Sequence, residues 1–239
     1  MSAHLYPVNI DASSWSAKDF YNETILNRSY KFARFLRRSV DESLGSGVPV
    51  WISEGSPNWK VRGPVSYNLT FELAYVDMLG SFAAGGVSLF ARQCLSSALG
   101  PGYVNPAFWV AIFWRRIMGR GVLPIDIDCD GVRAYGHVAL GSPGGTVGLV
   151  VLNLRQNETL EIPVGYPTTC LAQEEYHFTP GTPESGATVL INGVAPRFAS
   201  STATALPPLP PKVGQCGSLQ LQPRSFAFVA VRLRMGTAL

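Results

Sequence analysis

Glu54 is the residue of this chain whose type and position best suit covalent chemistry. It follows the apolar run from Val48 to Ile52 and begins a loop that contains an aromatic residue, Trp59. A carboxylate at the end of a strand, with an aromatic neighbour, is typical of a nucleophile that attacks the anomeric carbon of a sugar. The same pattern also fits an ordinary solvated glutamate in a turn, and the local sequence alone favours that simpler interpretation.

Arg92 and Gln93 end the next apolar run along the chain. Arg92 could bind a substrate carboxylate, or it could form a buried ion pair that bridges two strands, and the sequence leaves both interpretations open. His4 and Tyr6 could similarly close an earlier strand, although an isolated histidine is often structural. We expect His137 and His177, which fall inside later strands, to be structural.

Several familiar chemistries are excluded by the motifs that the sequence lacks. It has no P-loop, no GxSxG, no GxGxxG after a strand and no HExxH, which argues against nucleotide hydrolysis, dinucleotide binding and metalloprotease activity. No cluster of metal-ligand type is visible, so we expect no metal and no other cofactor.

Composition describes a folded, turn-rich protein. The 239 residues suggest one large domain or two ordinary ones, and 46% of them are hydrophobic. The formal net charge of +3 is too small to indicate nucleic-acid binding. The longest apolar run, Ala107 to Trp114, is far shorter than the roughly 20 residues that cross a membrane. The first fifteen residues do not resemble a signal peptide.

Sequons and cysteines bear on the compartment. Four candidate N-glycosylation sites are present, at Asn22, Asn27, Asn68 and Asn157. This number favours a secretory protein. The four cysteines are widely separated, without a CxxC pair, and could form two disulfides or none: Cys94, Cys129, Cys170 and Cys216.

The elements that would position these side chains differ between the two halves of the chain. Helical spacing predicts helices over 16–40, 67–79 and 107–118, and apolar runs predict strands over 48–52 and 87–91. This alternation indicates parallel βα units. From about Gly121 onward, short alternating runs separated by Gly, Pro and Asn predict an antiparallel β-sandwich, with 206–211 as a proline-rich strap between strands.

A set of short motifs occurs in a characteristic order along the chain. They are Trp51-Ile-Ser-Glu54-Gly, Ala91-Arg-Gln93, Trp114-Arg-Arg-Ile-Met-Gly-Arg-Gly-Val-Leu123, Val132-Arg-Ala-Tyr-Gly-His137, Glu174-Glu-Tyr-His177, Leu190-Ile-Asn-Gly193, Leu206-Pro-Pro208 and Ser225-Phe-Ala-Phe-Val229. The ordered set resembles the heparanase-like glycoside hydrolases of family 79, the plant-type members above all, from about His4 to Leu233.

The resemblance implies a fold and a set of site residues. The fold is multidomain, α/β plus all-β: the last three βα units of a (β/α)8 barrel, strands 6 to 8, in residues 1–120, and a C-terminal antiparallel β-sandwich in 121–239. Glu54 falls on the family's nucleophile, after the seventh barrel strand. The residues that fall on substrate-binding positions are His4 and Tyr6 near the sixth strand, Arg92 and Gln93 on the eighth, and Tyr103 beyond it.

This chain departs from the family pattern at two places. The family follows its nucleophile with a glycine-rich loop that receives the sugar carboxylate, whereas this loop has a single late glycine, Gly63. Either Lys60 or Arg62 takes over carboxylate binding by charge-assisted hydrogen bonds, or the pocket prefers another sugar. Val138 stands where the family commonly has a cysteine, so the family's disulfide does not carry over.

The family's general acid/base, a glutamate after the fourth barrel strand, has no counterpart in this chain. We therefore expect a fragment, inactive alone, of a retaining enzyme that cleaves β-glucuronidic linkages in glycans or glucuronides. Its expected partners are such a glycan and the missing N-terminal half of the barrel, from the same gene product or a separate subunit. The alternative is a non-catalytic carbohydrate-binding protein on the same scaffold.

The expected location follows from the same resemblance and from the sequons. We expect a glycoprotein of the secretory pathway that is extracellular, lysosomal or vacuolar, or attached peripherally to a membrane.

Overall fold

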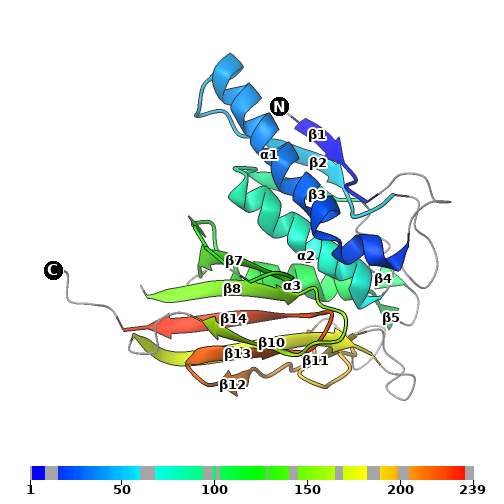
Figure 1. Ribbon diagram of the computed structural model, residues 1–239, viewed down its shortest axis with the longest axis vertical. Helices are drawn as coiled ribbons and strands as arrows, with labels where there is room; N and C mark the ends of the chain where they lie inside the picture. The colour runs from blue at the N-terminus through cyan, green and yellow to red at the C-terminus, as the bar shows by residue number, and fades with distance from the viewer. Residues whose placement is uncertain are drawn as a thin grey trace.

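The computed structural model places the chain in two parts that pack against each other. It describes residues 2–8, 16–59, 68–93, 99–100, 103–127, 129–139, 145–164, 169–181, 189–198 and 205–234. Figure 1 shows helices and a small parallel sheet, formed by the first half of the chain, lying over a larger antiparallel sheet formed by the second half.

The small sheet is built from βα units. Among the described residues its strands lie in the order β1 (Ser2–Leu5), β2 (Trp51–Gly55), β3 (Leu89–Arg92), and both pairs are parallel. Parallel neighbours require a crossover connection, and helices supply both of them. α1 (Glu23–Leu44) connects β1 to β2, and α2 (Leu69–Ala84) connects β2 to β3.

The first predicted helix is interrupted, so its prediction as one element over 16–40 is wrong. A 3-10 helix, η1 (Ala17–Tyr21), comes first, and Asp19 accepts a hydrogen bond from the backbone N–H of Ser16. Asn22 then has an extended backbone, and its side chain accepts from the N–H of Ile25 to cap α1. An amide side chain that competes for backbone hydrogen bonds favours such a break.

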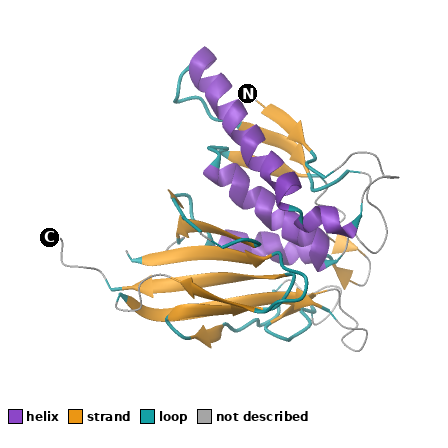
Figure 2. Cartoon of the chain, in the orientation of Figure 1, coloured by secondary structure: helices purple, strands orange, loops and turns teal. Residues whose placement is uncertain are grey.

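α2 forms the centre of the molecule. Most of its residues are buried on every side, as expected for a helix that is apolar all round. It lies between the parallel sheet and the antiparallel sheet in Figures 1 and 2. α3 (Pro106–Ile117) begins after the cap residue Asn105, with proline at its first position, where the missing N–H costs nothing. A short hairpin of β4 (Leu99–Gly100) and β5 (Tyr103–Val104) precedes it.

The large sheet is antiparallel throughout. In the described part of the chain its path runs β11-β10-β14-β8-β7-β6, and β12 also pairs with β10. The strands are β6 (Val122–Leu123), β7 (Val132–Val138), β8 (Thr146–Asn153), β10 (Cys170–Pro180), β11 (Val189–Ile191), β12 (Lys212–Gly214) and β14 (Ser225–Leu233).

The large sheet is covered on both faces. One face packs on α2 and α3 through an aromatic-rich core that includes Trp109, Phe113 and Phe228. The other face packs under an antiparallel pair of strands, β9 (Leu160–Val164) and β13 (Gly217–Leu221). The two halves of the chain therefore share the main core, and each half also has a smaller hydrophobic cluster of its own.

The alternation of helices and strands in the first half, and the change to antiparallel strands in the second half, follow the sequence prediction, with shifted boundaries. β2 runs from 51 to 55 rather than 48 to 52, and β3 from 89 to 92 rather than 87 to 91. The division at residues 120 and 121 stays a prediction; α3 ends at Ile117 and the first strand of the large sheet starts at Val122. Residues 206–211 precede β12 and belong to no strand.

One cysteine pair is bonded. Cys170 and Cys216 form a disulfide that ties the start of β10 to the turn before β13. Cys129 is a free, exposed thiol, and Cys94 lies outside the described residues. The two predicted alternatives were two disulfides or none; the Cys170–Cys216 bond contradicts the second, and the free thiol of Cys129 contradicts the first, which needs all four cysteines. No helix among the described residues is long and apolar enough to cross a membrane.

Candidate active site at the carboxyl ends of the parallel strands

Glu54 lies near the carboxyl end of β2, the middle parallel strand. Its register partner on β1 is His4, whose Nδ1 is 3.8 Å from Glu54 Oε1. The hydroxyl of Tyr6 donates a hydrogen bond to the same oxygen. The side chain of Glu54 is 34% exposed and that of His4 is 57% exposed. The structure thus brings together three of the residues predicted for the site and leaves the carboxylate accessible from solvent.

Tyr6 remains a hydrogen-bond donor at neutral and moderately alkaline pH. Burial raises the pKa of its phenol, and the hydrogen bond and charge of Glu54 raise that pKa further. A neutral phenol beside a carboxylate fixes the orientation of one oxygen and leaves the second oxygen to act. This geometry suits a carboxylate that must attack from a defined direction.

The backbone after Glu54 is fixed to the backbone after β1. The N–H of Val8 donates to the carbonyl of Pro57 at 3.0 Å, and the N–H of Ser56 donates to the carbonyl of Leu5 at 3.4 Å. The side chains of Ser56 and Asn58 are buried in this segment. Two strand ends that carry candidate site residues therefore form one connected unit.

Arg92 does not point its charge at this site. Its guanidinium forms two hydrogen bonds to Glu72 of α2, at 3.0 and 3.2 Å, and lies 4.0 Å from the ring centroid of Tyr75. Glu72 is fully buried and Arg92 is 7% exposed. Of the two interpretations, the buried ion pair is the contact that forms, although it joins strand to helix rather than strand to strand. A role in substrate binding stays a prediction.

The remaining predicted substrate-binding residues are less well defined. The residue Gln93 is exposed, and its N–H donates to the carbonyl of Gly55 at 2.8 Å. Lys60, Arg62 and Gly63 lie outside the described residues. Tyr103 belongs to β5, where its backbone pairs with Gly100, and its side chain lies outside the described residues.

A charged cluster that sequence reasoning missed joins α2 to the large sheet. Arg133 of β7 lies 3.2 Å from a carboxylate oxygen of Asp77, and the hydroxyl of Tyr135 donates to that oxygen at 2.6 Å. Burial raises the pKa of Asp77 to about 6, although Arg133 acts in the opposite direction. The sequence feature that could have revealed this cluster is Asp77, an acidic residue inside a mostly apolar helix.

The two histidines expected to be structural both have protein partners. Nδ1 of His137 lies 2.6 Å from the carbonyl of Gly119, and burial lowers the pKa of the ring. Nε2 of His177 lies 2.6 Å from the carboxylate of Glu175. The described residues contain no group of three or more His, Cys, Asp or Glu side chains that could hold a metal ion.

The four sequons occupy different settings. Asn22 and Asn68 cap α1 and α2 through their side-chain oxygens. Asn27 lies within α1 and accepts from Arg133 at 2.5 Å. Asn157 is exposed in the turn between β8 and β9. Glycosylation of each stays a prediction.

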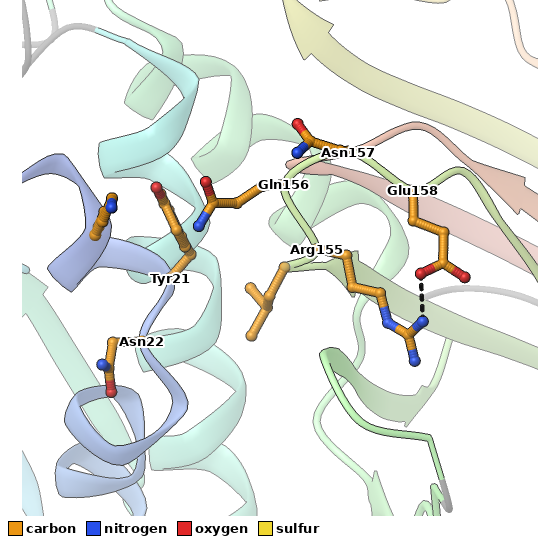
Figure 3. A pocket seen from close by; sticks show the side chains of 8 residues that line it. Tyr21, Asn22, Arg155, Gln156, Asn157 and Glu158 are labelled. Carbon is orange, nitrogen blue, oxygen red and sulfur yellow. Dashed lines mark hydrogen bonds and ion pairs between the residues drawn. The ribbon is translucent and has the colours of Figure 1, made fainter.

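An open groove lies away from Glu54, between η1 and the turn from β8 to β9. Its volume is about 870 Å³ and its walls are mainly polar. Figure 3 shows Tyr21 and Asn22 on one wall, and Arg155, Gln156, Asn157 and Glu158 on the other. Sequence analysis gave no indication of it beyond the two sequons that contribute Asn22 and Asn157.

Comparison with known proteins finds that the chain is similar to carbohydrate enzymes. No protein-family profile matches the chain. The chain is 24% identical to heparanase-like protein 1 of Arabidopsis thaliana over 95% of its own length and 49% of that protein. The predicted resemblance to heparanase-like proteins is confirmed. A baicalin-β-D-glucuronidase of Scutellaria baicalensis is 31% identical over 57% of the chain and 27% of the enzyme.

The chain also matches solved structures over nearly all of its length. A 4-O-α-L-rhamnosyl-β-D-glucuronidase from Fusarium oxysporum superposes with a TM-score of 0.70 at 14% identity, over 95% of this chain and 52% of that enzyme. Other matched folds are glycoside hydrolases as well. The α/β fold of the first half is thus of the type found in glycoside hydrolases with TIM-barrel-type folds, and the chain spans about half the length of the curated relatives it matches.

Proposed function

We propose that the protein is a glycoside hydrolase of heparanase type that cleaves β-glucuronidic linkages with retention of configuration. The observation that carries the proposal is the arrangement at the end of β2, where the side chain of Glu54 is partly exposed and one of its oxygens accepts a hydrogen bond from Tyr6. The names of the relatives support the substrate class, since two of the similar proteins act on glucuronides.

In the proposed reaction Glu54 is the nucleophile. Its free carboxylate oxygen attacks the anomeric carbon of the glucuronide, and the bond to the leaving oxygen breaks as a proton is delivered to that oxygen. A covalent glucuronyl ester forms on Glu54, and water then attacks the same carbon to release the sugar. Lys60 or Arg62 is proposed to bind the sugar carboxylate, and His4, Gly63, Arg92, Gln93 and Tyr103 to line the rest of the pocket.

The acid that protonates the leaving oxygen is proposed to come from another segment. A retaining glycosidase needs two carboxyl groups roughly 5–5.5 Å apart. The carboxylates of α2 are not candidates, because Glu72 is buried against Arg92 and Asp77 against Arg133. General acid catalysis is worth about 10²–10⁴-fold, so this chain alone is proposed to be inactive.

The unpaired edges and the exposed face of the parallel sheet support the proposal that the rest of a barrel lies outside this chain. In the described part of the chain, β1 and β3 each have a neighbour on one side only. One face of the sheet packs on α1 and α2, while the other face presents exposed side chains that include Trp51 and Leu89. Parallel sheets are normally covered on both faces, and closure into a barrel removes the unpaired edges. We propose that β1 to β3 are strands 6 to 8 of a (β/α)8 barrel, completed by a segment outside this chain.

A secretory location is part of the proposal. Disulfides such as Cys170–Cys216 persist in oxidising compartments. This bond supports the expectation, drawn from the four sequons, of an extracellular, lysosomal or vacuolar, or peripherally membrane-attached protein.

The test is nucleophile replacement in the full-length product. Glu54→Gln should lower kcat/KM for an aryl β-glucuronide by at least about 10³-fold, because the step that forms the covalent ester is lost. Glu42→Gln, an exposed glutamate on α1, is the matched control and should leave kcat/KM unchanged. Azide added to Glu54→Ala should restore turnover and yield a glucuronyl azide.

Two results would contradict the proposal. Unchanged activity in Glu54→Gln would remove this residue from the chemistry. A wild-type protein that binds glucuronides without cleaving them would favour the non-catalytic binding protein instead.

A further inference from the structure

The groove between η1 and the turn from β8 to β9 has the dimensions of a ligand site. Its volume of about 870 Å³ falls in the range of sites that hold small molecules. Its walls come from elements more than one hundred residues apart in sequence, Lys18 to Asn22 on one side and Leu154 to Glu158 on the other. Figure 3 shows the side chains of Tyr21 and Gln156 projecting from opposite walls.

The side chains of the groove suit a sugar chain. The amides of Gln156 and Asn157 offer donors and acceptors, and Asn22, whose oxygen caps α1, offers its N–H donors; these groups match the hydroxyl groups of a sugar ring. Tyr21 adds a flat aromatic surface, and the guanidinium of Arg224 lies 6.0 Å from the centroid of its ring. A flat ring flanked by hydrogen-bonding side chains can pack against the apolar face of a sugar while the amides bind its edges.

The charges of the groove favour a sugar chain that carries carboxylates. Arg155 is paired with Glu158 at 2.5 Å and also donates to the carbonyl of Asp130 at 3.0 Å. Lys18 lines the groove as a second cation, and Arg224 lies against the ring of Tyr21. Asp130 adds a negative charge near Arg155. The lining residues themselves carry a net charge of +1, from Lys18 and Arg155 against Glu158, and charge-assisted hydrogen bonds to carboxylates are about twice as strong as neutral ones.

The groove lies at the same end of the parallel sheet as Glu54. Arg28 of α1 donates to the carbonyl of Pro7 at 2.9 Å, which fixes the start of α1 beside the segment that follows β1. The backbone N–H of Val8, in that segment, donates a hydrogen bond to the carbonyl of Pro57, which lies three residues after Glu54. Figure 1 shows η1 on the side to which the arrowheads of β1 to β3 point.

We infer that this groove is a second glycan-binding site, which holds a remote part of a uronate-containing oligosaccharide while another part occupies the Glu54 site. The inference rests on the proposed function for its substrate class. A remote site of this kind adds affinity for long substrates without changing the chemistry on short ones, because a short substrate never reaches it.

The protein's own N-linked glycans are the competing occupant. Asn22 and Asn157 are both sequon residues and both line the groove. Thr24→Ala together with Thr159→Ala would remove both sequons while leaving the two asparagine side chains in place. This pair of substitutions distinguishes a substrate glycan bound in the groove from an N-linked glycan of the protein itself that occupies it.

The experiment measures binding and turnover separately on the full-length protein. Binding of a glucuronate-containing hexasaccharide is measured by calorimetry in the Glu54→Gln background, with cellohexaose as the neutral probe. Lys18→Ala combined with Gln156→Ala is the test variant, and Lys31→Ala, an exposed lysine of α1, is the matched control. In active protein, kcat/KM is compared between the hexasaccharide and an aryl β-glucuronide.

The expected result is selective for the long, charged ligand. The test variant should bind the hexasaccharide about tenfold more weakly and raise its KM, whereas Lys31→Ala and the sequon variant should match the parent protein. The kcat/KM for the aryl glucuronide should not change. Hydrogen exchange in η1 and in residues 154–158 should slow when the hexasaccharide binds.

Three results would overturn the inference. They are equal hexasaccharide binding by the test and control variants, equal affinity for cellohexaose, and binding that appears only after the sequons are removed, which would assign the groove to the protein's own glycans. A protein that cleaves neither substrate would contradict the proposed function, and the binding measurement would still decide whether the groove holds the glycan.

Discussion

Two tyrosine–carboxylate pairs in this molecule have the same chemistry and opposite settings. At the end of β2 the hydroxyl of Tyr6 donates to Glu54, whose side chain is 34% exposed. Between α2 and the large sheet the hydroxyl of Tyr135 donates to Asp77, whose side chain is fully buried. The first pair leaves one oxygen open to solvent, whereas the second adds the guanidinium of Arg133 to the same carboxylate oxygen.

Burial and the added cation decide what each carboxylate can do. A buried charge is tolerated only when it is paired, and the paired group is no longer accessible to a substrate. Asp77 is therefore a structural link between the helical half and the sheet half, and Gly80 leaves the space on α2 into which the ring of Tyr135 fits. Glu54, with a hydroxyl partner instead of a cation, keeps its charge available for reaction.

The largest expected effect comes from breaking the buried link. Arg133→Ala should lower the free energy of unfolding by about 3–5 kcal/mol, because it leaves the Asp77 carboxylate buried without its cation. Glu54→Gln should change that free energy by no more than about 0.5 kcal/mol, as for other partly exposed positions. Urea unfolding of both variants measures the contrast, and similar losses in the two would show that the comparison is wrong.

The pH dependence of stability sharpens the same contrast. Because burial raises the pKa of Asp77 from 3.8 to about 6, the folded state holds this proton more tightly than the unfolded state does. The contribution of Asp77 to stability should therefore fall as the pH rises from about 4 to about 6 and stay level above that range. The total fall should be about 3 kcal/mol, because each tenfold difference in proton affinity between the two states corresponds to about 1.4 kcal/mol.

Asp77→Asn isolates this contribution. The difference in unfolding free energy between the parent protein and Asp77→Asn, measured by urea titration at intervals across that range, should change with pH in the stated direction. A difference that does not vary with pH would mean that the carboxyl titrates normally.

The smallest expected effects come from removing the two hydroxyl groups. Tyr6→Phe in the full-length protein should lower kcat/KM for an aryl β-glucuronide by about tenfold and leave the unfolding midpoint unchanged, because it frees an oxygen of the nucleophile to rotate. Tyr135→Phe should do the reverse, costing about 1–2 kcal/mol of stability and leaving kcat/KM unchanged. Loss of activity in Tyr135→Phe with full stability would contradict this division of roles.

Much of the fold could be predicted from local sequence patterns. Apolar runs and helical spacing located β2, β3, α2 and α3 to within a few residues, since these elements are set by periodicity and by caps such as Asn105 and Pro106. The break at Asn22 was not predicted. Ser16 and Asn22 are both suitable helix caps, and only packing determines that each of them starts a separate helix.

The sequence predicted which residues lie near Glu54 better than it predicted their hydrogen-bond and ion-pair partners, and the catalytic role of the site stays a prediction. Glu54 was named because it follows an apolar strand, at the end where parallel-sheet enzymes keep their sites, whereas His4 and Tyr6 were assigned to the site by the family resemblance. The partner of Arg92 could not be chosen, since Glu72 lies on the preceding helix and periodicity does not distinguish ligand-binding from ion-paired arginines. The Asp77–Arg133 pair and the Cys170–Cys216 bond join residues 56 and 46 positions apart, which no local pattern specifies.

The most direct measurement of the central claim is covalent trapping of the nucleophile. A mechanism-based glucuronide inactivator is applied to the full-length product, and the labelled peptide is identified by mass mapping. The account predicts one glucuronyl label, carried by Glu54 and absent from Glu54→Gln. A folded protein that binds the inactivator yet carries its label elsewhere, or carries none, would contradict it.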